Sequence, residues 1–132
     1  MYVLDTNICI HVLKHRDRRL LHKFRAIRHL GVSTVTLGEM NYGIESGSAS
    51  LRQHRYEQLR LFTSQLTVLP WDDDAAQHYG VIRADLRKQG LMIGGNDLLI
   101  AAQARAASAV LVTNNTREFG RVPDLTVEDW LG

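Results

Sequence analysis

The chain has 132 residues, 45% of them apolar, and a formal net charge of only +2. A chain of this size can bury roughly two-thirds of its unfolded surface in one core, and the composition excludes disordered and collagen-like proteins. The longest wholly apolar run, residues 98–102, is too short to span a bilayer, and Asp5 interrupts the only stretch that resembles a signal peptide. We therefore expect a cytoplasmic protein without a membrane partner.

The charge is distributed unevenly along the chain. Residues 1–60 carry ten Lys/Arg and five Asp/Glu, a net charge of +5, whereas residues 61–132 carry six and nine, a net charge of −3. A basic half beside an acidic half suits a protein that holds an anionic polymer near an acidic, metal-dependent centre. The single cysteine, Cys9, excludes an internal disulfide and is expected to be a small buried hydrophobe.

The first predicted elements are a short apolar run at residues 2–4, which ends at Asp5, and a helix over residues 6–13. Apolar residues recur at spacings of three and four over residues 18–30, which predicts a second helix. The opposite face of this helix carries a basic stripe, formed by Arg18, His22, Arg25 and His29. The stripe is either an ordinary solvated face or a surface that contacts phosphates.

A strand is predicted at residues 32–35, followed by a helix over 36–47 and another over 50–64. Residues 66–69 predict a strand that Pro70 ends.

The clearest helix covers residues 71–90, with acids at its start, basic residues in its last turn and Gly90 as its end. Gly94 and Gly95 introduce a further helix, residues 109–113 predict a buried strand, and residues 125–130 close the chain. Strands that alternate with helices predict an α/β fold with a parallel sheet covered by helices on both faces.

Three acids, Asp5, Glu39 and Asp97, occupy equivalent places near predicted strand-to-helix junctions. In an open parallel sheet these junctions lie along the carboxyl edge, where ligands bind. We therefore expect all three acids to face one crevice.

Each acid also has an interpretation as a helix cap. Thr36 and Glu39 match a capping box, Asp5 can cap the first helix, and Asp97 can favour a helix dipole. Two carboxylates about 5 Å apart repel by roughly 3 kcal/mol at an effective dielectric near 20, more than the ~1 kcal/mol that a cap contributes. Clustering of these acids would therefore require a cation.

Oxygen ligands without suitably spaced histidine or cysteine indicate Mg²⁺ or Mn²⁺ and not zinc. The pair His11 and His15 lacks the glutamate and the third ligand of a zinc site, so exposed helix surface is the better interpretation. No glycine-rich nucleotide motif and no Gly-x-Ser-x-Gly motif is present.

Four segments, in this order and spacing, carry a resemblance: "LDTN" at residues 4–7, Glu39, "GGNDLLIAA" at 94–102 and "VTNNTREF" at 112–119. The sequence resembles the PIN-domain ribonucleases, most of all the enteric-type VapC toxins of toxin–antitoxin modules. The resemblance covers essentially the whole chain. It implies a single PIN domain over residues 1–132, with a three-layer α/β/α fold and a central, mostly parallel sheet.

The resemblance also implies a metal site with Asp5 and Asp97 as principal ligands and Glu39 beside them. Family members commonly place an aspartate where this chain has Asn115, so Glu118 is a candidate for the missing carboxylate. Thr6 and Thr113 would orient carboxylates, or serve as ordinary capping and turn residues.

The implied activity is that of a Mg²⁺- or Mn²⁺-dependent endoribonuclease toxin of a type II system, which cleaves initiator tRNA in its anticodon loop. The implied partners are a VapB-type antitoxin, which inserts a basic side chain among the acids, and a second copy of the chain in a homodimer. The residues expected to hold the RNA backbone are Arg18, His22, Arg25, Arg52 and Arg55.

Two other functions fit parts of the pattern. In a haloacid-dehalogenase-like phosphatase Asp5 would be a nucleophile, but that chemistry wants an acid where this chain has Asn7. A catalytically inactive PIN-like module for RNA binding or protein interaction would have lost activity through Asn115.

Overall fold

Five short strands form one sheet in the computed structural model, which describes residues 1–132. The strands are β1 (Tyr2–Leu4), β2 (Leu30–Ser33), β3 (Thr67–Leu69), β4 (Val110–Val112) and β5 (Thr126–Glu128). The helices are α1 (Thr6–His15), α2 (Arg18–Ala26), α3 (Thr34–Glu45), α4 (Arg52–Thr63), α5 (Asp73–Gln89), α6 (Gly95–Ala106) and α7 (Thr116–Phe119). The strand order is β3-β2-β1-β4-β5 and every pairing is parallel, which confirms the predicted α/β class.

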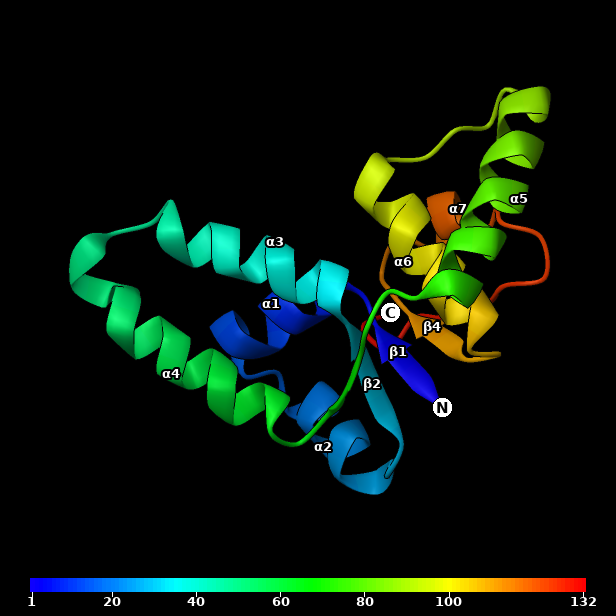
Figure 1. Ribbon diagram of the computed structural model, residues 1–132. Helices are drawn as coiled ribbons and strands as arrows, with labels where there is room; N and C mark the ends of the chain where they lie inside the picture. Colours follow the sequence, from blue (N-terminus) through cyan, green and yellow to red (C-terminus); the bar gives the residue numbers. More distant parts are fainter.

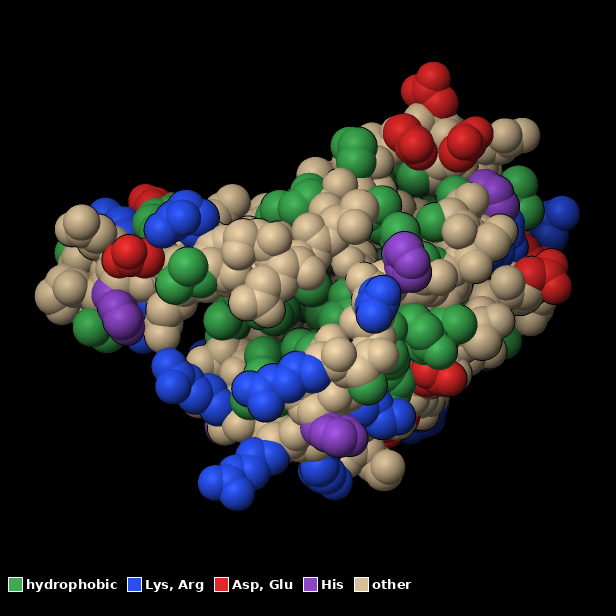
Figure 2. Space-filling view, turned by 90° about the horizontal axis from the view of Figure 1, so that it is seen from below, with side chains coloured by type: hydrophobic (Ala, Val, Ile, Leu, Met, Phe, Trp, Pro, Cys, Tyr) green, Lys and Arg blue, Asp and Glu red, His purple; other side chains and the backbone are tan.

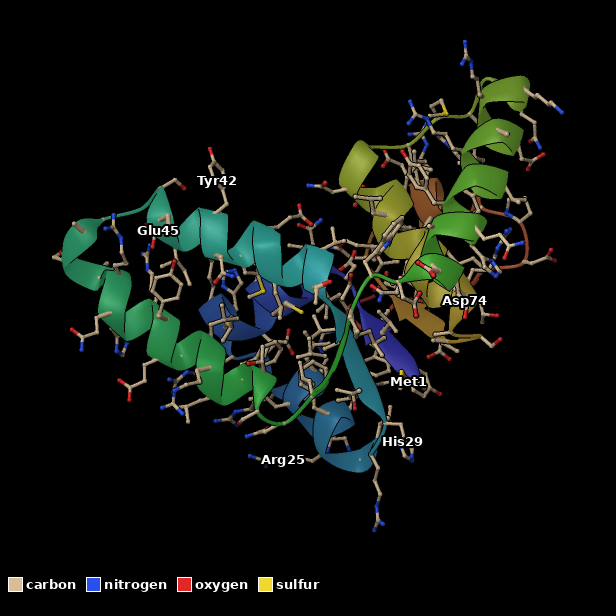
Figure 3. The ribbon with its side chains drawn as sticks, in the orientation of Figure 1. Met1, Arg25, His29, Tyr42, Glu45 and Asp74 are labelled. Carbon is tan, nitrogen blue, oxygen red and sulfur yellow. The ribbon has the colours of Figure 1, made fainter.

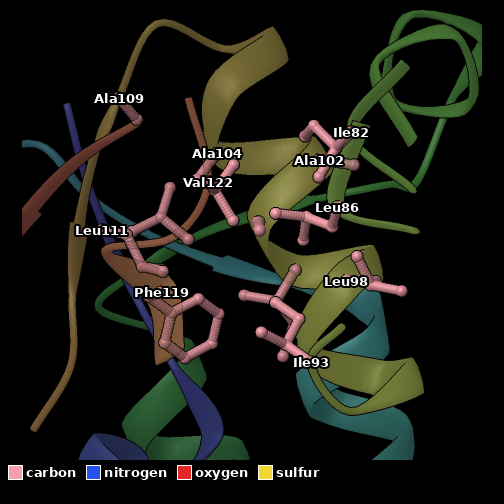
Figure 4. Packing of buried hydrophobic residues seen from close by; sticks show 13 residues of the cluster. Ile82, Leu86, Ile93, Leu98, Ala102, Ala104, Ala109, Leu111, Phe119 and Val122 are labelled. Carbon is pink, nitrogen blue, oxygen red and sulfur yellow. The ribbon is translucent and has the colours of Figure 1, made fainter. Parts of the chain in front are cut away.

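Alternating side chains of the central strands divide the core into two layers. Val3 and Leu111 pack with α5, α6 and α7 on one face of the sheet (Figure 4). Leu4 and Val112 point to the other face, where α1 to α4 cover them. This follows from the period of two in a strand and gives the predicted three-layer arrangement.

Figure 1 shows α3 and α4 running side by side as a long hairpin that extends beyond the edge of the sheet. The hairpin and α6 lie on either side of the carboxyl end of β1, so helices from both halves of the chain flank that end. No helix combines the length and the apolar character needed to cross a membrane.

The structure corrects three predicted boundaries around β2. α2 ends at Ala26, because Leu30 pairs with Tyr2 and the chain must already be extended there; His29 is therefore not part of a helical stripe. β2 ends at Ser33, two residues earlier than predicted, and α3 begins at Thr34. α5 begins at Asp73, two residues later than predicted, because the side chain of Asp72 caps it, and Gly90 ends it as predicted, with a φ of 68° that suits glycine.

Candidate active site

Asp5 directly follows β1 and caps α1. Its Oδ1 accepts a hydrogen bond of 2.8 Å from the backbone N–H of Ile8, and its side chain is buried. The backbone N–H of Asp5 donates to the carbonyl of Val112 at the end of β4. Between β1 and β4 the strand order changes direction, and ligands of open α/β sheets bind at such points. The cap is confirmed, and it holds one oxygen of Asp5 in place.

Glu39 does not close a capping box. α3 begins at Thr34, and the hydroxyl of Ser33 caps it by accepting from the N–H of Val35 at 3.0 Å. Glu39 therefore lies in the second turn of the helix, and Thr36 is fully buried inside it. Ser33 and Thr36 are both residue types that cap helices well. Because Ser33 is the last residue that pairs with β3, the helix begins directly after it, and Ser33 becomes the cap.

The carboxylate of Glu39 instead contacts α1. The hydroxyl of Thr6 donates to Glu39 Oε1 at 2.7 Å, and the Thr6 oxygen lies 3.1 Å from the hydroxyl oxygen of Thr36. A threonine at the start of one helix thus fixes an acid on another, as the sequence predicted for an orienting residue.

Asp97 lies in the first turn of α6, where the negative charges of the other acids act on it. Its pKa is raised to about 6, first by burial and then by the charges of Asp5, Glu118 and Glu39. Carboxylates from four separate segments are therefore close enough to repel one another. This is the convergence that the sequence predicted at the carboxyl edge of the sheet.

The pKa of Asp5 is also raised. Burial is the largest cause and the charge of Glu39 adds to it, whereas hydrogen bonds from the Thr113 hydroxyl and the Ile8 N–H oppose it. Thr113 also accepts from the backbone N–H of Asn115 at 2.9 Å, so its hydroxyl links β4 to the turn that follows.

Asn115 holds Glu118. Its side-chain amide donates to Glu118 Oε2 at 3.1 Å, and Glu118 lies one turn later in the short helix α7. The neutral residue at the family's usual aspartate position thus positions a carboxylate instead of supplying one.

Several of these groups line an open pocket of about 680 Å³, whereas Thr113, Asn115 and Glu118 are not among its lining residues. Its lining includes Asp5, Thr6, Glu39 and Asp97, together with Asn7, Asn96 and Tyr42. The sequence did not predict that Asn96 and Tyr42 belong to the site. Asn96 directly precedes Asp97, and Tyr42 lies about one helical turn after Glu39. A smaller apolar groove of about 270 Å³, between α1, α3 and α4, shares Glu39 with this pocket.

The donor set suits a hard divalent cation. All of its donors are oxygens, and burial together with the charges of the other acids raises the pKa of Asp97, so a neutralising charge there would be favourable. No group of three or more His, Cys, Asp or Glu side chains is arranged so that it could hold a metal ion. Mg²⁺ usually keeps several waters and takes one or two carboxylates, so Asp5 and Asp97 are sufficient for this chemistry.

Comparisons with known proteins agree with this geometry. The profile of the PIN domain matches residues 2–125. The chain belongs to the PIN-domain family. It is 41% identical over 131 residues to "Ribonuclease VapC2" of Haemophilus influenzae, with 98% of each chain covered. It is 40% identical to "tRNA(fMet)-specific endonuclease VapC" of Shigella flexneri, with 98% and 97% covered.

Among solved structures, DNA-bound VapBC from Salmonella typhimurium has a chain with a TM-score of 0.93 and 38% identity, over 98% of this chain and 97% of that one. Membership in the PIN-domain family excludes the phosphatase alternative. The resemblance drawn from the four sequence segments is thereby confirmed.

In this PIN domain most of the predicted RNA-binding residues lie apart from the acids. Arg18, His22 and Arg25 are exposed on α2, and Figure 3 places Arg25 on the opposite side of the view from Tyr42. Figure 2 shows Lys and Arg side chains gathered on the face of the molecule seen from below. Arg52 donates to the carbonyl of Glu45, while Arg55 lines the apolar groove that adjoins Glu39.

Proposed function

We propose that this PIN domain is a metal-dependent endoribonuclease toxin. The observation that carries the proposal is the position of Asp97, whose pKa is raised to about 6 first by burial and then by the charges of Asp5, Glu118 and Glu39. Such an arrangement is unfavourable alone and becomes favourable around a divalent cation. The relatives from Haemophilus influenzae and Shigella flexneri are a ribonuclease and an endonuclease by name, which agrees with this chemistry.

Asp5 and Asp97 would hold the ion. When bound, Mg²⁺ or Mn²⁺ supplies charge neutralisation at the scissile phosphate and lowers the pKa of water. The Ile8 N–H holds Oδ1 of Asp5, and the Thr113 hydroxyl also hydrogen-bonds this carboxylate, so both neighbours would orient it for an ion. Burial of Asp5 limits the alternative orientations of its carboxylate.

Glu39 and Glu118 are the candidates to accept a proton from the attacking water. Thr6 holds one oxygen of Glu39 and Asn115 holds one oxygen of Glu118, so each acid keeps a second oxygen for this role. The water oxygen bonds to phosphorus, the bond to the 3′ oxygen breaks, and that oxygen takes up a proton. The products carry 5′-phosphate and 3′-hydroxyl ends.

The proposed substrate is initiator tRNA, cleaved in its anticodon loop. This rests on the Shigella flexneri relative, which is named for tRNA(fMet), and on the preference of sequence-specific readers for single-stranded loops.

The proposed partners are a VapB-type antitoxin and a second copy of the chain in a homodimer. The structures from Rickettsia felis, Salmonella typhimurium and Haemophilus influenzae are VapBC complexes. The apolar groove beside Glu39 offers room for an antitoxin segment, and a basic side chain from it would satisfy the same carboxylates as the cation.

Cleavage of initiator tRNA by purified Asp5→Asn protein tests the proposal. Asparagine caps a helix as well as aspartate does, so α1 is retained while one ligand charge is lost. We expect the Mg²⁺-dependent rate to fall at least about a hundredfold, with the Asp124→Asn variant as a control on an exposed aspartate. Unchanged cleavage by Asp5→Asn would contradict the proposal, and RNA binding without any cleavage by the wild type would support the non-catalytic module.

A further inference from the structure

Tyr42 differs from the other three tyrosines of the chain. Tyr2 packs against Trp130, Tyr56 donates its hydroxyl to Glu45, and Tyr79 contacts both Trp71 and Arg83. Tyr42 has 75% of its surface exposed and makes none of these contacts. Figure 3 shows its side chain standing clear of α3. A large flat ring is therefore presented to solvent.

The position of Tyr42 ties it to the acidic pocket. Val35, Gly38, Glu39 and Tyr42 follow the spacing of one helix face, and all four line the pocket. Tyr42 is three residues beyond Glu39, which places it about 4.5 Å further along the helix axis. The ring thus stands at the edge of the pocket, next to the proposed catalytic carboxylates.

The surface beside the ring is open. Gly38 lies one turn before Tyr42, and a Cβ built on it would meet no atom within 4 Å. The residues on either side of Tyr42, Asn41 and Gly43, are exposed and carry no large apolar group. This leaves room for a flat group against the ring.

The charge of the pocket adds a further reason. The proposed cation would neutralise the carboxylates only where it binds, so a strand that enters also gains from attraction of a kind that does not depend on charge. Stacking of a base on an aromatic ring supplies such attraction, and any base can take part because every base has a flat face.

We propose that Tyr42 is a stacking platform for a nucleobase next to the scissile phosphate of single-stranded RNA. This inference rests on the proposed ribonuclease function and adds to it a residue that positions the substrate. The ring holds one base against α3, and the adjoining phosphate is then held over Asp5 and Asp97.

Binding to RNA that is not cleaved tests the inference. Asp5→Asn protein with Mg²⁺ would be titrated with a fluorescein-labelled anticodon stem-loop of initiator tRNA, with and without Tyr42→Ala. We expect Tyr42→Ala to raise the Kd about tenfold or more, equally at low and high salt, because stacking is not ionic. Tyr42→Phe should restore most of the lost affinity. Leu61→Ala, which truncates another exposed apolar side chain, on α4, is the matched control.

The kinetics of the active protein give a second readout. Tyr42→Ala should raise KM more than it lowers kcat, since the ring binds RNA and takes no part in the bond changes. Removal of the base on each side of the mapped cleavage position should cancel the effect of Tyr42→Ala at one of the two positions.

Three results would overturn the inference. One is a Kd for Tyr42→Ala equal to that of its parent, while Asp5→Asn still abolishes cleavage; the ribonuclease function would then stand without the stacking role. Another is an altered oligomeric state in sedimentation with unchanged RNA affinity, which would make Tyr42 a protein contact. The third is loss of affinity in Tyr42→Phe as large as that in Tyr42→Ala. Full cleavage by Asp5→Asn would instead count against the proposed function itself.

Discussion

The acidic pocket and the basic surface of α2 hold their charges in different ways. Asp5 and Glu39 line the pocket; Asp5 is buried, and Glu39, like Glu118 outside the pocket lining, accepts a hydrogen bond from a fixed neighbour. On α2, Arg18 and Arg25 are exposed on a helix face, where water and salt screen them. The comparison shows that the carboxylates are held in fixed positions, whereas the charges on α2 lie free in solvent. Three measurements test this difference.

The largest effect is expected from Thr6→Val. This change keeps the shape of the side chain but removes the hydroxyl that donates to Glu39 Oε1 at 2.7 Å. Loss of an orienting partner in a metal site typically costs 10- to 100-fold, so we expect kcat to fall by about tenfold. Thr6→Ser should retain the hydrogen bond and most of the rate. Equal rates for Thr6→Val and Thr6→Ser would show that Glu39 needs no positioning.

A smaller effect is expected on stability without divalent cations. The pKa of Asp97 is raised from 3.8 to about 6, so between these pH values the folded state keeps a proton that the unfolded state has released. Stability should therefore fall as the pH rises from about 4 to about 6. Two pKa units correspond to about 3 kcal/mol, and partial solvent exposure of Asp97 reduces this to about 1 kcal/mol.

Urea unfolding at several pH values would measure this effect. Asp97→Asn should flatten the pH dependence and Asp124→Asn, an exposed aspartate, should not. Mg²⁺ should stabilise the wild type most at the upper end of the range, where Asp97 is ionised. A pH dependence shared by wild type and Asp97→Asn would mean that the carboxylates do not repel as described.

The smallest effect is expected from Arg25→Ala. If α2 contacts the RNA backbone, the Kd should rise about two- to threefold at low salt, and the salt slope should fall by about 0.7 for the lost phosphate contact. Arg87→Ala, on the exposed face of α5, is the matched control. An unchanged salt slope for Arg25→Ala would mean that the basic surface of α2 faces solvent and does not contact RNA.

The acids could be placed from the sequence because a parallel sheet brings strand ends to one edge. Asp5 follows an apolar run and Asp97 follows two glycines, so both positions could be predicted without knowing any side-chain contact. The surroundings of Glu39 could not be predicted, because Ser33 and Thr36 are equally good caps and only pairing of β2 with β3 selects Ser33. His29 was wrongly placed in a helix for a similar reason. The spacing of the residues around it fits either a helix or an extended segment, and the hydrogen bond from the Tyr2 N–H to its carbonyl makes it extended.

The central place of β1 has a consequence for how the protein is made. Within this chain β1 is synthesised long before one of its two neighbours, β4, which begins only at Val110. During synthesis Asp5 therefore lies beside an open strand edge, and the Thr113 hydroxyl and Asp97 reach it only later. We therefore expect a partly synthesised chain to lack the assembled acidic site and to be unable to cut RNA.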